Sequence, residues 1–271
     1  SGQHGIRGLD VSDEQILVER SENDIVTVTL NRPEKLNALT KNMWGRLGDV
    51  FAELSADDSV RCIVITGAGE KSFSPGNDIS EFETDRSNSE KAAAYGALMA
   101  RNIDTMKACP HPTLAAIRGI CVGGGMEIAG LCDVRICGES SRFGAPIAKL
   151  GLVMGYHEIG ALSGLVGKTA ALEILLEGHI LDSETALRLG VVTRVVPDET
   201  VMVEAFEAAE RIAAGAPLVH RWHKKFLKRL QDPTPLSDAE IAEGYACYDT
   251  EDFKEGYNAF LQKKTPAFKG R

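Results

Sequence analysis

The sequence predicts a layered α/β fold that is followed by a helical tail. Short apolar runs typical of buried strands recur through roughly the first two thirds of the chain, and helical periodicities separate them. Beyond about residue 196 only helical patterns remain. We therefore expect an α/β core over residues 1–196 and a C-terminal helical region over residues 197–271.

The first predicted unit is a strand, a helix and a second strand. Residues 25–30 alternate apolar residues with threonine, as a half-buried strand does. Thr40 suits the N-cap of a helix, because apolar residues then recur at helical spacing: Met43, Leu47, Val50, Phe51 and Leu54. Residues 61–66 form a dense apolar run before Gly-Ala-Gly, which is typical of a strand buried on both faces. This order predicts a right-handed crossover.

A second cycle and the tail follow. We expect a helix near 89–108, a strand at 113–118, a glycine turn at 123–125 that opens a helix, and a strand at 133–138. In the tail, helical periodicity over 198–214 ends at Gly215 and Pro217, and further helices are expected at 217–230 and 236–262. Large apolar side chains in this tail need a surface to cover, so it should dock on the core or on another subunit.

Composition excludes several classes of protein. The 271 residues include 30 Lys plus Arg and 39 Asp plus Glu, so the net charge is −9, which argues against a bulk nucleic-acid binder. No run free of charged residues and histidine reaches ten residues, whereas a membrane-spanning helix needs about 20 apolar residues. The opening SGQHGIRG lacks the apolar core of a secretory signal, so we expect a cytoplasmic location and no membrane partner.

Cysteine and histidine spacing gives no metal-binding pattern. The six cysteines never form Cys-x-x-Cys, and most lie in apolar runs: Cys62, Cys109, Cys121, Cys132, Cys137 and Cys247. They indicate small buried residues in a reducing compartment. His220 and His223 are close in sequence, but their basic neighbours favour a solvated helix face. We expect no metal.

Two glycine-bearing turns follow predicted strands, at residues 73–79 and 122–128. Gly123, Gly124 and Gly125 stand where a helix should begin, and the unpaired amides of a first helical turn suit a developing negative oxygen. The alternative is a close packing contact between helix and strand.

Glu127 strengthens the functional interpretation. It follows Gly124 by three residues, a spacing that carries it about 4.5 Å along the same helix face. A carboxylate and an oxyanion donor in one pocket suit chemistry beside an acyl carbonyl, because donors hold an enolate oxygen while the carboxylate moves a proton. A donor is worth about 3–4 kcal/mol and the carboxylate about 10²–10⁴ in rate.

Rival motifs fail on spacing. Residues 164–169 end like a phosphate-binding loop, but Leu162 stands where that loop requires glycine, so we interpret Lys168 as a lysine at a helix start. There is no Gly-x-Ser-x-Gly of a serine hydrolase and no Gly-x-Gly-x-x-Gly after the first strand.

With these glycine turns and Glu127, the chain resembles the crotonase superfamily, the enoyl-CoA hydratases and isomerases. The resemblance covers nearly the whole chain through six segments: 31–39, 73–82, 118–137, 166–172, 186–196 and 260–269. It implies a crotonase-like spiral of ββα units with a C-terminal helical trimerisation region, as a homotrimer or a hexamer built as a dimer of trimers. It also implies an acyl-CoA thioester substrate, with coenzyme A entering as part of the substrate and no separate cofactor.

The resemblance also assigns residues. The two oxyanion amides fall on Asn77 and Gly124, and the first catalytic glutamate falls on Glu127. Other positions match segments that hold the pantetheine and adenine ends of coenzyme A or cover its nucleotide, often from a neighbouring subunit: Lys35, Leu36, Pro75, Phe260 and Lys263. Asp78 is expected to cap the following helix rather than to react.

The sequence departs from the hydratase pattern at the second glutamate. Ile147 stands after Pro146 where that glutamate is expected, and isoleucine cannot transfer a proton. Residues 154–158 then read Met-Gly-Tyr-His-Glu, so we hypothesise that Glu158 or His157 replaces the missing group, with Tyr156 shaping the pocket. The alternative is ordinary helix capping.

We therefore predict an acyl-CoA-transforming enzyme of the hydratase or isomerase type, with Glu127 as general acid or base. The alternatives are a CoA-thioester decarboxylase or hydrolase of the same fold, or a weakly catalytic CoA-binding homologue.

Overall fold

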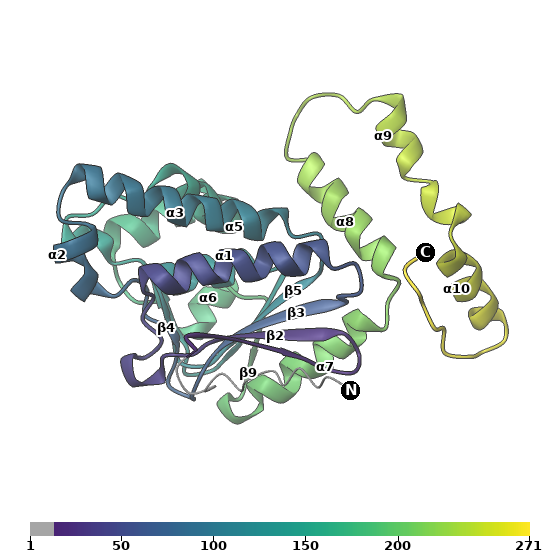
Figure 1. Ribbon diagram of the computed structural model, residues 1–271, viewed down its shortest axis with the longest axis horizontal. Helices are drawn as coiled ribbons and strands as arrows, with labels where there is room; N and C mark the ends of the chain where they lie inside the picture. The colour runs from purple at the N-terminus through teal and green to yellow at the C-terminus, as the bar shows by residue number, and fades with distance from the viewer. Residues whose placement is uncertain (1–13) are drawn as a thin grey trace, which may run out of the picture.

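A computed structural model describes residues 14–271 (Figure 1). The opening residues on which the predicted location rests lie outside this part. A six-stranded sheet has the order β1-β2-β3-β5-β7-β9, in which β1 and β2 are antiparallel and all other neighbours are parallel. Its strands are β1 Ile16–Arg20, β2 Ile25–Leu30, β3 Cys62–Gly67, β5 Thr113–Ile117, β7 Val134–Gly138 and β9 Arg194–Val196.

A second, three-stranded parallel sheet consists of β4 Ser72–Ser74, β6 Ile120–Val122 and β8 Arg142–Gly144. Each of its strands follows a strand of the large sheet and precedes a helix: α3 Ser89–Ala108, α4 Gly124–Gly130 or α5 Tyr156–Glu177. Three ββα units therefore follow one another, as the crotonase-like spiral requires. The short strands of this second sheet, and β1 and β9, were not among the expected elements.

The first unit forms as the sequence predicts. The Thr40 hydroxyl accepts a hydrogen bond from the Met43 amide (3.0 Å) and caps α1, Lys41–Ala56. All six residues of β3 are buried, as expected for a strand covered on both faces. Helices α1 and α3 lie side by side over one face of the large sheet, and α7, Val201–Ala213, lies under the other (Figure 1).

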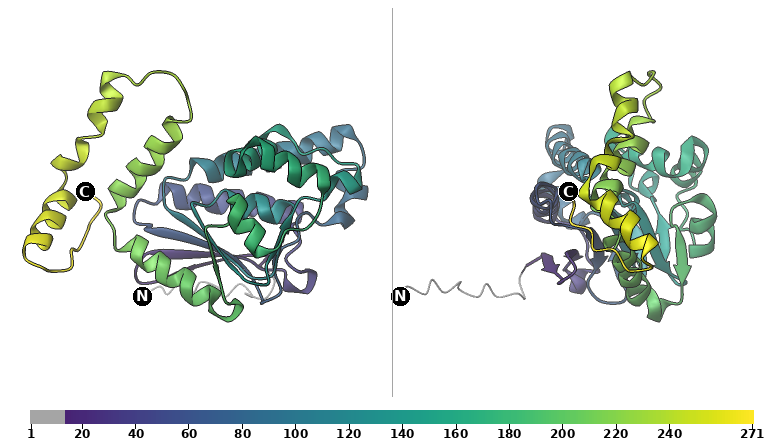
Figure 2. Two further views of the ribbon diagram at one scale, coloured as in Figure 1. Left: turned by 180° about the vertical axis from the view of Figure 1, so that it is seen from behind. Right: turned by 90° about the vertical axis from the view of Figure 1, so that its right-hand side faces the viewer.

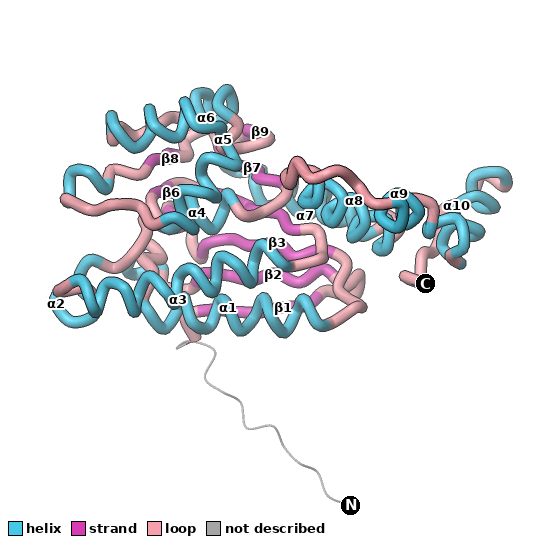
Figure 3. Tube along the Cα trace, turned by 90° about the horizontal axis from the view of Figure 1, so that it is seen from above, coloured by secondary structure: helices cyan, strands magenta, loops and turns pink. Residues whose placement is uncertain are grey.

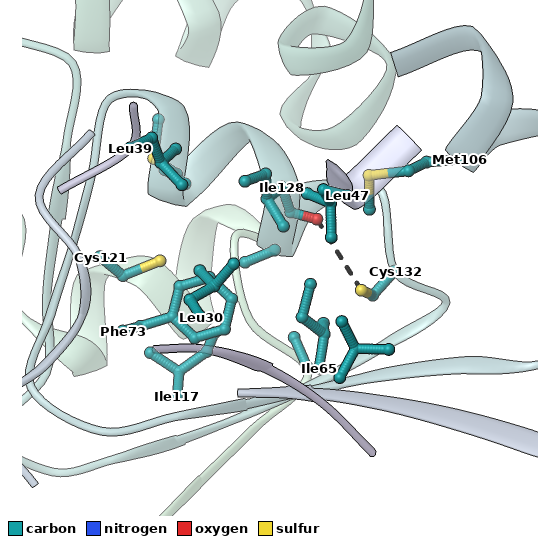
Figure 4. Packing of buried hydrophobic residues seen from close by; sticks show 14 of the residues in the cluster. Leu30, Leu39, Leu47, Ile65, Phe73, Met106, Ile117, Cys121, Ile128 and Cys132 are labelled. Carbon is teal, nitrogen blue, oxygen red and sulfur yellow. Dashed lines mark hydrogen bonds between the residues drawn. The ribbon is translucent and has the colours of Figure 1, made fainter. Parts of the chain in front are cut away.

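The main apolar core lies between the sheets and the helices α1, α3 and α4. Figure 4 shows Leu30, Phe73, Ile117 and Cys121 gathered within it, and each of these side chains is fully buried. Five of the six cysteines are buried and all are free, as expected for small apolar residues. Burial raises the pKa of the Cys62 thiol to about 12, so this thiol stays protonated at neutral pH.

The C-terminal part divides into a helix on the sheet and an extension. Helix α7 packs on the sheet through Val201, Ala205 and Ala209. Helices α8 Pro217–Arg229, α9 Asp238–Glu243 and α10 Glu251–Leu261 extend to one side of the core (Figures 2 and 3). The single helix expected over 236–262 is wrong: a 3-10 turn at Ala246–Asp249 interrupts it, and Thr250 starts α10 by accepting from the Phe253 amide.

Helix α5 has an unusually apolar exposed surface. Among residues 14–271 it is the one helix whose length and mean hydropathy, 1.5, would allow it to cross a membrane. It also packs on the core through Leu162 and Ile174, whereas Leu176 is 76% exposed. Gly167 breaks its backbone (φ 81°, ψ 162°), so Lys168 begins a new helical segment, as the sequence predicted.

One lysine connects the extension to the core. The Lys224 ammonium lies 2.8 Å from the Asp133 carboxylate and donates to the His111 carbonyl at 2.7 Å. Its neighbour Lys225 forms an ion pair with Glu243, within the extension.

We expect Lys224→Met to lower the free energy of unfolding by about 1 kcal/mol, since it removes a half-buried ion pair and a charged hydrogen bond. Amide exchange in α8 should become faster, as measured by hydrogen–deuterium exchange with mass spectrometry. Lys225→Met is the matched control. Equal exchange in the two variants would show that Lys224 does not hold α8 on the core.

Candidate active site

Each of the three positions at the start of α4 is occupied by glycine for a different structural reason. Gly123 has a positive φ of 56°, a conformation that favours glycine. A Cβ atom on Gly125 would lie 2.3 Å from the Ser74 carbonyl oxygen, so only glycine lets α4 approach β4 this closely. A Cβ atom on Gly124 would lie 3.1 Å from Leu39 and 3.2 Å from Trp44. The triplet is thus a helix–strand packing contact and also an opening at the helix start.

Two main-chain amides lie close together at this opening. A Cβ atom on Gly76 would be 3.1 Å from the Gly124 nitrogen, so the peptide that joins Gly76 to Asn77 is adjacent to the first turn of α4. The Gly76 carbonyl accepts from the Leu39 amide (2.8 Å), and in a trans peptide this directs the Asn77 N–H away from Leu39. In the described part of the chain this N–H has no acceptor.

Among residues 14–271 the Gly124 N–H likewise has no acceptor, for a similar reason. The Gly123 carbonyl accepts from the Glu127 amide at 3.0 Å, so the N–H of the same peptide points out of the helix start. Gly124 is the first residue of α4, where an amide has no intrahelical partner. Two unpaired donors therefore stand beside each other at the positive end of a helix.

The side chain of Asn77 is fixed by a residue that the sequence analysis missed. The Trp44 indole N–H donates to Asn77 Oδ1 at 2.7 Å, and Asn77 Nδ2 lies 3.7 Å from the Met99 sulfur. Trp44 also adjoins Gly124, so one buried ring contacts both residues with free amides. The sequence could have indicated this role, because Trp44 lies within the apolar stripe of α1 and a buried indole N–H needs a hydrogen-bond acceptor.

Asp78 has a structural role, as expected. Its carboxylate accepts from the Ser80 amide (2.9 Å) and caps a 3-10 turn at Ile79–Glu81. The Ser80 hydroxyl and the Arg32 guanidinium, 2.7 Å away, lower the pKa of Asp78 to about 2. An ionised carboxylate with these partners caps and anchors the turn that carries Asn77.

Glu127 lies one turn into α4, beside a small cavity between α4 and α5. The other residues that line this cavity are apolar: Met126, Gly130, Met154, Ala161, Leu162 and Leu165. Glu127 Oε2 is buried and has no hydrogen-bond partner within residues 14–271. Burial, and secondly the charge of Glu158, raise the pKa of Glu127 to about 8. The carboxyl group can therefore both accept and release a proton near neutral pH.

Glu158 approaches Glu127 from α5. It lies three, four and seven residues before Ala161, Leu162 and Leu165, so it shares the helix face that lines the cavity. Its Oε2 also accepts from the Gly155 amide at 3.1 Å. Glu158 thus caps α5, as one of the two interpretations predicts, and its charge raises the pKa of Glu127. Its replacement of the second glutamate stays a prediction.

The other two residues of this segment point elsewhere. His157 Nδ1 lies 3.2 Å from an Asp104 carboxylate oxygen on α3, and both side chains are half exposed. Tyr156 is 94% exposed. The structure therefore brings Glu158, and not His157 or Tyr156, toward Glu127.

Ile147 opens a 3-10 turn, Ile147–Leu150, directly after Pro146. Its side chain is partly buried and packs against the main apolar core. The position at which the resemblance expects a second glutamate is therefore apolar in its surroundings as well as in its side chain.

Arg86 is a second residue that the sequence analysis missed. It follows the short helix α2, Phe82–Asp85, and its guanidinium lies 4.7 Å from the centre of the Phe82 ring and 5.0 Å from that of Tyr95. Its positive charge lowers the pKa of Glu127 and so opposes the effects of burial and of Glu158. No motif marks an arginine whose position depends on the packing of two aromatic rings.

Three of the positions matched to coenzyme A binding lie together. Lys35 and Leu36 end a 3-10 turn, and the Leu36 carbonyl accepts from the Ser72 hydroxyl at 2.7 Å. Pro75 directly follows β4, the strand that contains Ser72. Phe260, 83% exposed, lies at the end of α10, on the far side of the molecule from β4 and α2 (Figure 1), and Lys263 follows it. A single chain does not bring these two residues to the site.

The burial of Glu127 gives a prediction about stability. Its folded pKa of about 8 exceeds the ordinary value of 4.5, so the stabilisation that accompanies its protonation is complete below pH 4.5 and is lost as pH rises through 8. At about 1.4 kcal/mol for each pH unit, Glu127→Gln should be more stable than the wild type by a few kcal/mol at pH 8 and nearly equal at pH 5. Urea denaturation at both pH values measures this difference.

The control for this experiment is Glu173→Gln, which changes an exposed carboxylate on the neighbouring helix α5. Parallel stability–pH curves for the wild type and the Glu127→Gln variant would contradict the elevated pKa.

Comparison with known proteins shows the family to which the chain belongs. Residues 20–271 match the family model described as enoyl-CoA hydratase/isomerase. A short-chain-enoyl-CoA hydratase of Clostridium acetobutylicum is 34% identical over 94% of this chain and 98% of its own. An (E)-benzylidenesuccinyl-CoA hydratase of Thauera aromatica is 35% identical over 92% and 96%. The crystal structure of an enoyl-CoA hydratase/carnithine racemase from Magnetospirillum magneticum superposes with a TM-score of 0.93 at 48% identity, over 95% and 96%. The chain belongs to the enoyl-CoA hydratase/isomerase family, the crotonase superfamily that its motifs resemble.

Proposed function

We propose that this enzyme transforms acyl-CoA thioesters by holding the thioester oxygen with the amides of Asn77 and Gly124 and by moving protons with Glu127. The observation that carries the proposal is the grouping of two unpaired amides at a helix start with a buried carboxylate one turn away. As negative charge develops on the thioester oxygen, both donors strengthen their hydrogen bonds to it, which lowers the barrier to enolate formation.

Glu127 alone is sufficient for double-bond isomerisation. Its carboxylate takes a proton from the α-carbon of a 3-enoyl thioester, and the electron pair moves into the enolate held by the two amides. The double bond then forms beside the thioester as the carboxyl returns the proton to the γ-carbon. A pKa near 8 suits this cycle, because the group is readily protonated and deprotonated at neutral pH.

Glu158 makes hydration of a 2-enoyl thioester possible as well. One carboxyl group takes a proton from water as its oxygen adds to the β-carbon, and the other protonates the α-carbon of the resulting enolate. The charge of Glu158 is near enough to raise the pKa of Glu127, so the two groups can share one substrate. The names of the Clostridium and Thauera relatives, both hydratases, favour this reaction.

Binding and assembly complete the proposal. Coenzyme A enters as part of the substrate, along Lys35, Leu36 and Pro75, and no further cofactor is required. Phe260 and Lys263 cover the nucleotide of a neighbouring subunit, since they lie far from the site of their own chain. Helices α8–α10 and the exposed apolar face of α5 are the surfaces that we propose to be buried in a homotrimer or hexamer.

We expect Glu127→Gln to retain coenzyme A ester binding and to lose about 10²–10⁴ in kcat with crotonyl-CoA or a 3-enoyl-CoA ester, because the amide moves no proton. Absorbance of the conjugated thioester follows both reactions. Tight binding with no reaction of any ester by the wild type would favour a binding protein, and release of carbon dioxide or of free coenzyme A would identify a decarboxylase or a hydrolase.

The same variant tests the amide pair directly. In its complex with an unreacted enoyl-CoA ester, the infrared stretch of the thioester carbonyl should move to lower frequency than in water, because two donors polarise that bond. An unshifted band would exclude Asn77 and Gly124 as oxyanion donors.

The pH dependence separates the roles of Glu158 and His157. If Glu127 acts as a base, kcat/KM should rise with pH to a midpoint near 8, and Glu158→Gln should move this midpoint lower because a repelling charge is lost. A loss of tenfold or more in kcat for hydration would additionally make Glu158 a proton-transfer group. His157→Ala is the comparison variant, expected to leave the profile unchanged. Wild-type turnover in both variants would remove the replacement hypothesis.

A further inference from the structure

Arg86 has hydrogen-bond donors that the protein does not use. Within residues 14–271 its guanidinium makes no ion pair within 4 Å and no hydrogen bond, and the residue is half buried. The rings of Phe82 and Tyr95 hold it through their faces, which leaves the N–H groups at its edge available. A guanidinium held in this way is prepared for a planar, bidentate anion.

The nearest carboxylates on its own segment are already engaged. Glu81 accepts from the Lys41 amide at 2.8 Å and lies 3.4 Å from the Tyr95 hydroxyl. Asp85 lies 3.8 Å from the Lys41 ammonium. These contacts direct both acids toward α1 and α3, so neither forms an ion pair with Arg86.

Arg86 lies at the acyl end of the proposed site. It covers Tyr95 on α3, and Met99, one turn further along that helix, contacts the side chain of Asn77. The charge of Arg86 also acts on Glu127, whereas Lys35 and Leu36, at the proposed coenzyme A end, lie beside Ser72. The guanidinium therefore lies over a residue of α3 that is one helical turn from Met99, which contacts the side chain of Asn77.

We propose that Arg86 is a specificity residue that binds a second carboxylate, carried by the acyl group of the CoA thioester substrate. The substrate class is then a dicarboxylic enoyl-CoA, in which one carboxyl is the thioester and the other pairs with Arg86. Burial against two rings strengthens such a pair relative to one in water. The inference rests on the proposed function, because it identifies the acyl group on which the same site acts.

The test compares two esters that differ only in the second carboxylate. Hexenoyl-CoA and hexenedioyl-CoA, each with the double bond next to the thioester, are assayed for kcat/KM with the wild type, Arg86→Gln and Arg86→Lys. We expect the wild type to prefer the dicarboxylic ester, and Arg86→Gln to lower kcat/KM for that ester by about 10- to 100-fold. The monocarboxylic ester should lose less, and only because the Arg86 charge near Glu127 is removed, so the ratio of the two kcat/KM values reports the effect of the second carboxylate. Arg86→Lys should recover only part of the preference, since lysine binds a carboxylate as a point charge.

Two alternative roles of Arg86 would give different results in this assay. If Arg86 only tunes the pKa of Glu127, Arg86→Gln moves the pH profiles of both esters to higher pH and leaves their ratio unchanged. If Arg86 contacts a phosphate of coenzyme A, the losses for the two esters are equal. Either result overturns the proposal. Arg101→Gln, which changes an exposed arginine on α3, controls for the general effect of removing a positive charge.

Binding measurements separate this inference from the proposed function. Calorimetric titration of the Glu127→Gln variant with each ester gives the ratio of the two Kd values without any turnover. A preference for the dicarboxylic ester that Arg86→Gln removes, together with no reaction in the wild type, would support Arg86 and overturn the enzymology. Turnover of both esters with equal Kd values would support the proposed enzymatic activity and overturn the proposed role of Arg86. If neither ester bound, both proposals would be wrong.

Discussion

The site depends on one close approach, that of the first turn of α4 to the end of β4. Only a glycine at position 125 lets the helix backbone contact the Ser74 carbonyl, because any side chain there would overlap that atom. The contact fixes the helix start against the turn that carries Asn77, and Asp78 anchors that turn from its other end. An amide of the helix and an amide of the turn therefore become neighbours without any functional side chain. Packing of the second sheet against a helix thus determines where the two amides that we propose as oxyanion donors lie.

The second consequence of this contact is electrostatic. With α4 in place, Glu127 lies one turn deeper than Gly124, in apolar surroundings where ionisation is costly. Glu158 increases this cost and Arg86 reduces it, so burial and two residues from other elements jointly determine the pKa of the Glu127 carboxyl. The buried carboxyl group that we propose to transfer protons lowers the stability of the protein at neutral pH, a common feature of functional sites.

Sequence patterns predicted the parts of the fold that depend on local regularities. Long apolar runs and a capped amphipathic helix gave β3 and α1, and glycine with glutamate at helical spacing gave Gly124 and Glu127. The strands of the second sheet are three residues long, too short for a period-two pattern to emerge from its surroundings.

The contributions of Trp44 and Arg86 could not be predicted by the same means. Trp44 meets Asn77 because α1 packs near β4, and Arg86 is placed by rings from α2 and α3. The break between α9 and α10 was not predicted. A single threonine that can cap a helix is a weaker signal than the helical periodicity that continues on both sides of it. Contacts between distant segments decide these features, and one sequence carries no direct record of them.

The resemblance predicts a glutamate where this chain has Ile147, and we propose that Glu158 supplies a second proton-transfer group instead. Ile147 and Glu158 belong to the same ββα unit, and the 3-10 turn that starts at Ile147 leads into α5. On α5, Glu158 shares one face with Leu162 and Leu165, and this face lines the cavity beside Glu127. A carboxylate on this face approaches Glu127 from the helix rather than from the turn, while an apolar residue in the turn packs against the core. The bond from the Gly155 amide holds Glu158 at the helix start, so its carboxylate is oriented before substrate binds. An acid placed in this way would act on the acyl chain from a different direction, and the position of the acyl group would have to adapt to it. Arg86, which adjoins the same end of the site, would supply that adjustment by holding the far end of the acyl chain.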